Sequence, residues 1–167
     1  MLIVRCHHER SDGSGYPEGL FGGSLPDLAR MVAITDAYDS MTGGYYRPAM
    51  TPTDALQVLK TQASEEYGED LVEDFIRCLG TYPVGSLVEL NSGALVMVVA
   101  SNSQARLKPK VMLLCNEEGK FEKPRMLTDL ADFTDQDLSD RWGIRGLVDP
   151  TEAGIDVRGV VLEEIQF

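Results

Sequence analysis

The sequence is poor in cysteine, which narrows the folds and sites that it can support. Its three cysteines, Cys6, Cys78 and Cys115, are widely spaced, odd in number and without a CxxC pair. This set excludes a disulfide framework and a zinc knuckle, because both need paired or clustered thiols. We therefore expect the protein to work in a reducing compartment, the cytoplasm.

Long apolar runs and clustered positive charge are also missing. No segment approaches the roughly 18 apolar residues that span a bilayer, and the apolar start at residues 1–4 is too short for a signal-peptide core. With 15 basic and 27 acidic residues, the formal net charge of -12 repels a phosphate backbone. The basic residues are scattered, so we expect no DNA binding, whereas a small anionic ligand held by a metal is compatible.

The composition is otherwise that of a globular protein with two different parts. Hydrophobic residues make up 43% and charged residues 25% of the chain, so a core can form. The sequence pattern changes from helical to strand-like between Gly80 and Gly85. We predict a helical part over residues 1–80 and a small antiparallel β module over residues 81–167, which makes the fold class α+β.

Start and stop signals predict three helices in the first part. Ser24 caps a helix that runs to about Met41, Thr51 caps a second, and a third lies between Gly68 and Gly80. In the second part, valine-rich alternation predicts strands. These are residues 86–90 and 94–100, joined as a hairpin, then 111–115, a partner strand from Lys120, and a closing strand over 157–167. Residues 127–142 predict a short helix or an ordered loop.

Both histidines stand together near the start of the chain, in the run Cys6-His7-His8-Glu9. Neutral imidazole and carboxylate are ligands that suit iron, manganese or zinc. The following segment, Asp-Gly-Ser-Gly-Tyr-Pro over residues 12–17, cannot continue a helix. The pattern predicts a metal-ligand helix end that runs into a shaped loop.

A further carboxylate is a candidate ligand on the first long helix. Asp36 and Asp39 are three residues apart and project to one side, and Asp36 is aligned with the small residues Ala29 and Ala33. A carboxylate on a packed face needs a partner, because an unpaired buried charge is costly. A metal held by His7 and His8 would supply that partner.

These residues match a known pattern. The run from His7 to Leu20 (HHERSDGSGYPEGL), then Ala29-Arg30 and the run from Ile34 to Thr42 (ITDAYDSMT), closely resemble the second half of an HD-GYP domain. The resemblance covers about residues 1–80 and implies the helical part of an HD-superfamily domain. It also implies hydrolysis of the bacterial messenger cyclic di-GMP with divalent transition metals, commonly iron, with manganese as an alternative.

The resemblance assigns roles to individual residues. It implies that His7, His8 and Asp36 are metal ligands. Gly15, Tyr16 and Pro17 would lie near the substrate and would also contact diguanylate cyclase domains. It implies no catalytic residue beyond these metal ligands. We expect Glu9 and Asp12 to contact the ligands without binding the metal and so to orient the ligand side chains.

The sequence departs from the family in two respects. The family takes further ligands from an upstream His-Asp pair and from other upstream Glu and His residues, whereas this chain has only two histidines. We therefore expect a fragment or a naturally shortened protein, inactive in isolation. The family also follows Met-Thr with a basic pattern that grips phosphates; here Arg47 is the one cation left for substrate binding, and Tyr45 stands where the first arginine is expected.

Plainer interpretations stay open for several residues. Glu9 would be a structural carboxylate and not a direct ligand, Asp12 would cap the glycine-rich turn, and Tyr16 and Pro17 would be turn residues alone. Three hypotheses on function follow. The chain is part of a cyclic di-GMP phosphodiesterase, or a non-catalytic module that binds partner domains through the Gly-Tyr-Pro loop, or a metal-dependent phosphohydrolase for another cyclic dinucleotide or nucleotide.

Overall fold

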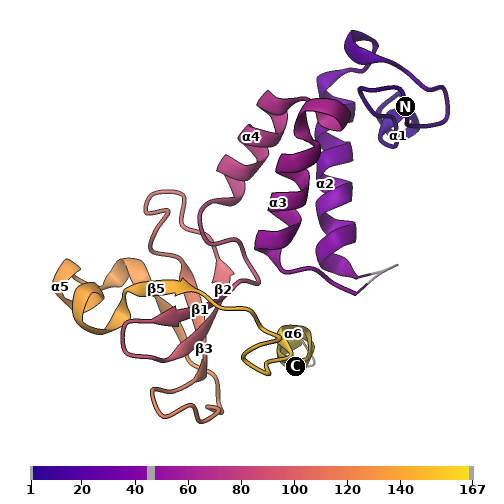
Figure 1. Cartoon of the computed structure of the whole chain (residues 1–167). Helices are drawn as coiled ribbons and strands as arrows, with labels where there is room; N and C mark the ends of the chain where they lie inside the picture. The colour runs from indigo at the N-terminus through magenta and orange to yellow at the C-terminus, as the bar shows by residue number, and fades with distance from the viewer. Residues whose placement is uncertain (1, 45–47, 166–167) are drawn as a thin grey trace. The chain divides into compact units, whose positions relative to one another are not determined.

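The computed structural model describes residues 2–44 and 48–165, which form two units divided between Cys78 and Leu79 (Figure 1). The first unit is helical and the second is built on an antiparallel sheet, so the predicted α+β class is confirmed. The division falls close to the predicted change of pattern between Gly80 and Gly85. Each unit is described by itself.

The helices of the first unit follow the predicted starts and stops. They are α1 (Leu2–Cys6), the 3-10 turn η1 (Gly22–Ser24), α2 (Asp27–Gly43), α3 (Pro52–Gln62), the π-helical turn η2 (Ala63–Tyr67) and α4 (Glu69–Leu79). Gly44 closes α2 in the left-handed conformation, with φ 63°. Thr51 caps α3, because its Oγ1 accepts the Asp54 N–H at 3.1 Å.

One predicted cap is wrong. Ser24 belongs to η1, and the residue that precedes α2 is Pro26, which makes no side-chain cap. The proline fixes its own φ at -61°, so the chain enters the helix without a hydroxyl acceptor.

The core of the first unit forms where α2, α3 and α4 pack together (Figure 1). Its buried members are Ala33, Ile34, Leu59, Tyr67 and Val72. A smaller cluster joins α1 to the start of α2, with Cys6, Leu25 and Ala29 buried. The small side chains of α2 therefore allow close packing on two sides, which brings the end of α1 against this helix.

The second unit contains a five-stranded antiparallel sheet in the order β4-β3-β2-β1-β5. The strands are β1 (Leu87–Leu90), β2 (Leu95–Ala100), β3 (Lys110–Cys115), β4 (Leu127–Asp129) and β5 (Ile144–Leu147). Adjacent residues of β1 enter different core clusters, Leu87 with Met97 and Val88 with Val98. Both faces of the sheet are thus covered, as the near-continuous valine and leucine runs require.

The predicted hairpin of β1 and β2 is confirmed, but two other predictions for this unit are wrong. Residues 157–167 do not form a closing strand, because α6 (Val157–Ile165) is a helix. Its start is held by Asp156, whose Oδ1 accepts the Gly159 N–H at 3.0 Å. The partner strand of β3 begins at Leu127 and not at Lys120, where only an isolated bridge at Phe121 follows the turn.

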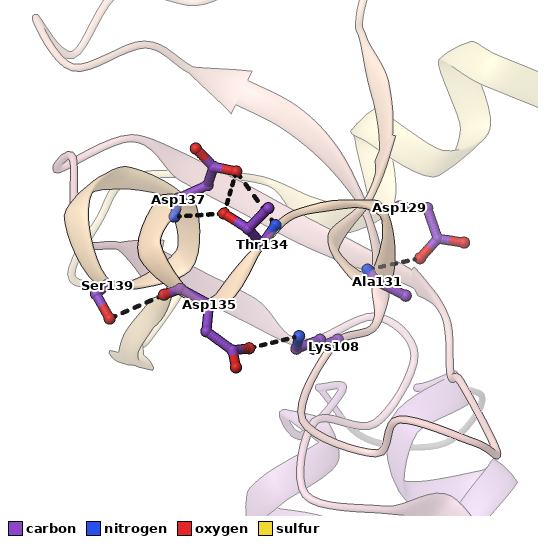
Figure 2. Close-up of polar contacts among 7 residues, drawn as sticks. All are labelled: Lys108, Asp129, Ala131, Thr134, Asp135, Asp137 and Ser139. Atoms are coloured by element: carbon purple, nitrogen blue, oxygen red, sulfur yellow. Dashed lines mark hydrogen bonds and ion pairs between the residues drawn. The ribbon is translucent and has the colours of Figure 1, made fainter.

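The acidic segment after β4 is ordered by its own side chains, as Figure 2 shows. Asp129 Oδ1 accepts the Ala131 N–H at 3.0 Å at the 3-10 turn η3 (Leu130–Asp132). Thr134 and Asp137 form a capping box at α5 (Asp135–Asp137), which continues into the π-helical turn η4 (Leu138–Trp142). Lys108 Nζ pairs with Asp135 Oδ1 at 3.1 Å. These carboxylates therefore serve local structure.

None of the helices within the described ranges has the length and apolar character needed to cross a bilayer.

Candidate functional site

The helical unit brings His8 and Asp36 close together from two elements. His8 follows α1 directly, and Asp36 lies in the middle of α2. Their Nδ1 and Oδ2 atoms are 3.9 Å apart, and the side chains are 38% and 49% exposed. The distance exceeds that of an ordinary hydrogen bond, so the imidazole and the carboxylate are neighbours without a direct hydrogen bond between these two atoms.

The exposure of Asp36 corrects the expected burial of its carboxylate. The tightly packed face of α2 consists of Ala29, Ala33 and Ile34, all at most 2% exposed. Asp36 lies on the same side as Ala29 and Ala33, one turn further along the helix, but its side chain remains open to solvent. It therefore needs no buried counter-charge and is accessible to a ligand.

His7 is oriented by the backbone of α1. Its Nδ1 lies 2.7 Å from the carbonyl oxygen of Val4. A carbonyl can only accept, so Nδ1 carries the proton and, in the neutral ring, Nε2 keeps the lone pair. Metal-binding histidines are commonly oriented by such a bond to a backbone carbonyl. The rings of His7 and His8 lie side by side, with centroids 3.9 Å apart.

The side chains of His7, His8 and Asp36 are of the types that bind a divalent transition metal, but they are too few to complete a metal site. Imidazole nitrogen and carboxylate oxygen suit iron, manganese and zinc. Within the described ranges, however, no three His, Cys, Asp or Glu side chains converge into a group that could hold a metal ion. His8 and Asp36 would supply two ligands and would leave the coordination shell open.

The loop that follows the histidines contacts this pair through Tyr16. We call residues 10–19 the GYP loop. The Tyr16 ring stacks on the His8 ring at a centroid distance of 4.8 Å, and the Tyr16 N–H donates to the His8 carbonyl oxygen at 3.3 Å. Tyr16 is nevertheless 61% exposed, and Pro17 beside it is also exposed. Of the predicted substrate-side residues, Tyr16 thus lies against a predicted ligand, His8.

Gly15 allows this approach because it has no side chain. A Cβ at this position would lie 2.3 Å from the backbone nitrogen of Arg10 and 2.4 Å from the Cα of Glu9. Both atoms belong to the backbone and cannot move aside cheaply. The close crossing of the two chain segments therefore requires glycine.

Glu9 joins the two ends of the GYP loop through its contacts with Glu18 and Leu20, which we call the neck of the loop. The side chain is buried, at 2% exposure, with one carboxylate oxygen on each of two backbone groups. Oε1 accepts the Glu18 N–H at 2.6 Å, and Oε2 accepts the Leu20 N–H at 3.0 Å. A buried carboxylate that receives two N–H donors is satisfied, so Glu9 holds the two ends of the loop together, which is a structural role.

Asp12 braces a turn within the loop. Its Oδ1 accepts the Ser14 hydroxyl at 2.7 Å and the Ser14 N–H at 2.9 Å. These two bonds lower the pKa of the Asp12 carboxyl below its ordinary value. Asp12 therefore caps the turn as an ionised group, and a role for Glu9 or Asp12 in orienting metal ligands stays a prediction.

Arg10 anchors the loop to η2, a contact that the sequence does not reveal. Its Nε donates to Glu66 Oε2 at 3.0 Å, and its guanidinium lies 4.8 Å from the centroid of the Tyr67 ring. Burial raises the pKa of Tyr67 to about 12, and the nearby negative charge of Asp36 adds to that rise. No local sequence pattern predicts this contact, because Arg10 and Glu66 are 56 residues apart and meet only in the folded chain.

Arg47, the predicted phosphate contact, lies outside the described residues, as does Tyr45.

Each of the two units matches a family model. The model of the HD domain matches residues 1–71, and the model of a KOW domain associated with HD domain matches residues 87–136. The first of these covers α1 to the start of α4, with the His8–Asp36 pair and the GYP loop inside it. The second covers the sheet from β1 to β4.

Several curated relatives are similar to this chain over part of their length. A cyclic di-GMP phosphodiesterase of Pseudomonas aeruginosa is 34% identical over 149 residues, which are 84% of this chain and 36% of the relative. A cyclic di-GMP phosphodiesterase response regulator of Xanthomonas campestris is 40% identical over 77 residues, 46% of this chain and 20% of the relative. A 3'3'-cGAMP-specific phosphodiesterase of Vibrio cholerae is 37% identical over 59 residues, 35% of this chain and 14% of the relative.

The helical unit thus matches the HD domain over residues 1–71, and it is followed by a module that matches the KOW type. More narrowly, the chain belongs to the HD-GYP family, because the Gly-Tyr-Pro loop and both histidines accompany the matched HD domain. It spans about a third of the length of the first relative and about a fifth of the second.

Proposed function

We propose that this chain supplies one side of the active site of a metal-dependent phosphodiesterase that hydrolyses cyclic di-GMP. The observation that carries the proposal is the convergence of His8, Asp36 and Tyr16 from three separate segments. The names of the relatives support the substrate, since those from Pseudomonas and Xanthomonas are cyclic di-GMP phosphodiesterases. We place the reaction in the bacterial cytoplasm, in keeping with three free cysteines.

In this proposal His7, His8 and Asp36 hold the metal, with iron as the first choice and manganese as the second. A bound divalent metal supplies a Lewis acid that neutralises charge on the phosphodiester and lowers the pKa of the attacking water. Val4 keeps the His7 lone pair on Nε2 through its carbonyl, and Tyr16 fixes the plane of the His8 ring. Glu9 and Gly15 keep the GYP loop beside the ligands.

The isolated 167-residue chain is proposed to bind metal weakly and not to turn over substrate. Two histidines and one neighbouring carboxylate leave most coordination positions unfilled, and affinity falls steeply when ligands are missing. Further donors must come from another segment or another chain. Contacts with the substrate through Gly15, Tyr16, Pro17 and Arg47 belong to the same proposal.

The test is a comparison of metal and cyclic di-GMP binding among four forms of the chain under reducing conditions. We expect iron-dependent binding of cyclic di-GMP that is lost in His8→Ala and Asp36→Asn and retained in Asp39→Asn, an exposed carboxylate on the same helix. Binding that is equal in all forms would refute the metal-centred proposal. Hydrolysis by the isolated chain would refute its proposed inactivity alone.

A non-catalytic role is the second candidate, and it is favoured by the exposure of Tyr16. This large aromatic side chain is 61% exposed at the tip of a braced loop, where it could bind a partner such as a diguanylate cyclase domain. A pull-down with purified diguanylate cyclase domains, with the chain and with Tyr16→Ala, tests this role. Capture that needs neither Tyr16 nor the intact loop would rule it out.

A further inference from the structure

A cavity with no assigned role lies in the helical unit, beside the base of the GYP loop. Its volume is about 540 Å³, within the range of small-molecule sites. Side chains from four segments line it, together with three glycines whose missing side chains keep it open. The lining is Ser11, Asp12, Phe21, Gly22, Gly23, Arg30, Glu65 and Gly68.

Two polar atoms of this lining are buried without a hydrogen-bond partner among the described residues. They are the hydroxyl oxygen of Ser11 and the Nε of Arg30. Buried polar groups nearly always make a hydrogen bond. Two donors without a partner in the same cavity therefore indicate that a ligand supplies the acceptor. Arg30 reaches this position because Gly68 has no Cβ, which would lie 2.7 Å from Arg30 Nη1.

The charges of the lining argue against a phosphate as the missing acceptor. Asp12 and Glu65 carry two negative charges, and the one guanidinium in the lining, Arg30, is already paired with Asp27. A dianion would be repelled here. A neutral ligand with both acceptors and donors matches the mixture of guanidinium, hydroxyl and carboxylates better.

Guanine has this combination of groups. Its O6 and N7 accept from arginine or hydroxyl donors, and its N1–H and N2–H₂ donate to carboxylates. The Phe21 ring is 70% exposed at the cavity and offers a face on which a base can stack. Adenine lacks the O6 acceptor and the N1–H donor, so the same lining would bind it less well.

The cavity is connected to the GYP loop through two segments of its lining. Ser11 follows His8 by three residues, and its N–H donates to the Glu66 carbonyl at 2.8 Å. Gly68 follows Tyr67, whose ring centroid lies 4.8 Å from the Arg10 guanidinium. Both segments of the lining are therefore held to the GYP loop, which contacts the proposed ligand His8 through Tyr16.

We propose that this cavity is a subsite for one guanine base of the cyclic dinucleotide, with Arg30 and Ser11 as donors, Asp12 and Glu65 as acceptors, and Phe21 as the stacking surface. The assignment rests on the proposed function for its substrate class. A single subsite selects one base, so it would accept any cyclic dinucleotide that contains at least one guanine.

The test uses guanosine and adenosine, which have no phosphate, with the full 167-residue chain and a chelator that removes metal. Amide chemical shifts should change for Ser11, Gly22 and Gly68 on saturation with guanosine, with adenosine about tenfold weaker. Phe21→Ala removes an exposed ring without disturbing the core, and it should weaken the binding of guanosine about fivefold or more. Glu65→Gln and Arg30→Lys should also weaken it, and Val4→Ala, another exposed apolar side chain, should not.

Equal binding of the two nucleosides, shifts elsewhere in the chain, or unchanged binding by Phe21→Ala would overturn the subsite. Because metal and phosphate are absent, this result is separate from that of the metal-binding test. Guanosine selectivity together with metal-independent dinucleotide binding would uphold the subsite and refute the proposed function. Metal-dependent dinucleotide binding without guanosine selectivity would do the opposite.

Discussion

The imidazole of His8 lies against the phenol ring of Tyr16, with the ring centroids 4.8 Å apart and the planes 29° from parallel. The two residues are separated by most of the GYP loop, so this contact depends on the loop's folded path. It ties the orientation of a proposed ligand to the position of an exposed aromatic side chain.

Replacing Tyr16 should therefore change the surroundings of His8 directly. In Tyr16→Ala the His8 ring protons lose the ring current of the phenol and should shift, while Tyr16→Phe keeps the stacked ring and should not. Stability should fall by at most about 1 kcal/mol, because the pair is exposed. A proton NMR spectrum of the ring resonances, which come from only two histidines, measures this. Unchanged His8 resonances in Tyr16→Ala would contradict the stacking.

Removing the charge of Glu9 should loosen the neck of the GYP loop. Glu9→Gln leaves one of the two backbone N–H groups facing an amide NH₂, so we expect a loss of about 1–3 kcal/mol in the free energy of unfolding. Hydrogen exchange should accelerate at the amides of Glu18 and Leu20. Glu18→Gln is the matched control, since that carboxylate is exposed and pairs only with Arg5 among the described residues. Equal protection of these two amides from hydrogen exchange in both variants would contradict the proposed role of Glu9 in holding the loop.

Gly15→Ala should be among the most damaging single-methyl additions in the helical unit. The new Cβ meets backbone atoms at 2.3 and 2.4 Å, so the GYP loop must move or the crossing must open. We expect destabilisation of about 2 kcal/mol or more. Gly23→Ala is the control, because a Cβ there meets nothing within 4 Å. Thermal unfolding of both variants checks the difference, and a Gly15→Ala midpoint equal to that of Gly23→Ala would refute it.

Tyr67 should make the helical unit sensitive to alkaline pH. Its pKa is raised by burial to about 12 in the folded chain, against 10.0 for an ordinary tyrosine. The unfolded chain loses the proton first, so stability is full below pH 10 and falls as pH rises towards 12, by an amount on the order of 2 kcal/mol. Unfolding in denaturant across this range measures the loss.

The tyrosine variants separate this effect from general alkaline damage. Tyr67→Phe should flatten the dependence between pH 10 and 12, whereas Tyr16→Phe, which changes an exposed ring, should keep it. If Tyr67→Phe lost stability as steeply as the unchanged chain, another group would be responsible.

The helices of the first unit could be predicted because their signals are local. Thr51 caps α3 through its own hydroxyl, and Gly44 and Gly80 stop helices with a positive φ. The approach of His8 to Asp36 could only be inferred from the family pattern. Their spacing in sequence, 28 positions apart, contains no information on the packing of Cys6 and Ala29 that brings α1 to α2.

Two elements of the second unit, α6 and β5, were not predicted, for different physical reasons. The valine-rich run from Val157 suggested a strand, but Asp156 supplies a helix cap and the apolar residues Val157 and Val160 recur at helical spacing. Strand β5 is only four residues long and includes Gly146, so its pairing with β1 depends on contacts from far along the chain. Tertiary pairing therefore decides β5, whereas the local cap and spacing decide α6.

The neck made by Glu9 has a consequence for how this family can vary. One side chain grips two amides that lie nine and eleven positions downstream, and the two carboxylate oxygens are fixed relative to each other. Substitutions at the exposed tip leave this grip intact, but an insertion or deletion between Glu9 and Leu20 would bring the wrong amides to the carboxylate. The loop therefore tolerates substitution at its exposed tip, but not a change in the number of residues between Glu9 and Leu20.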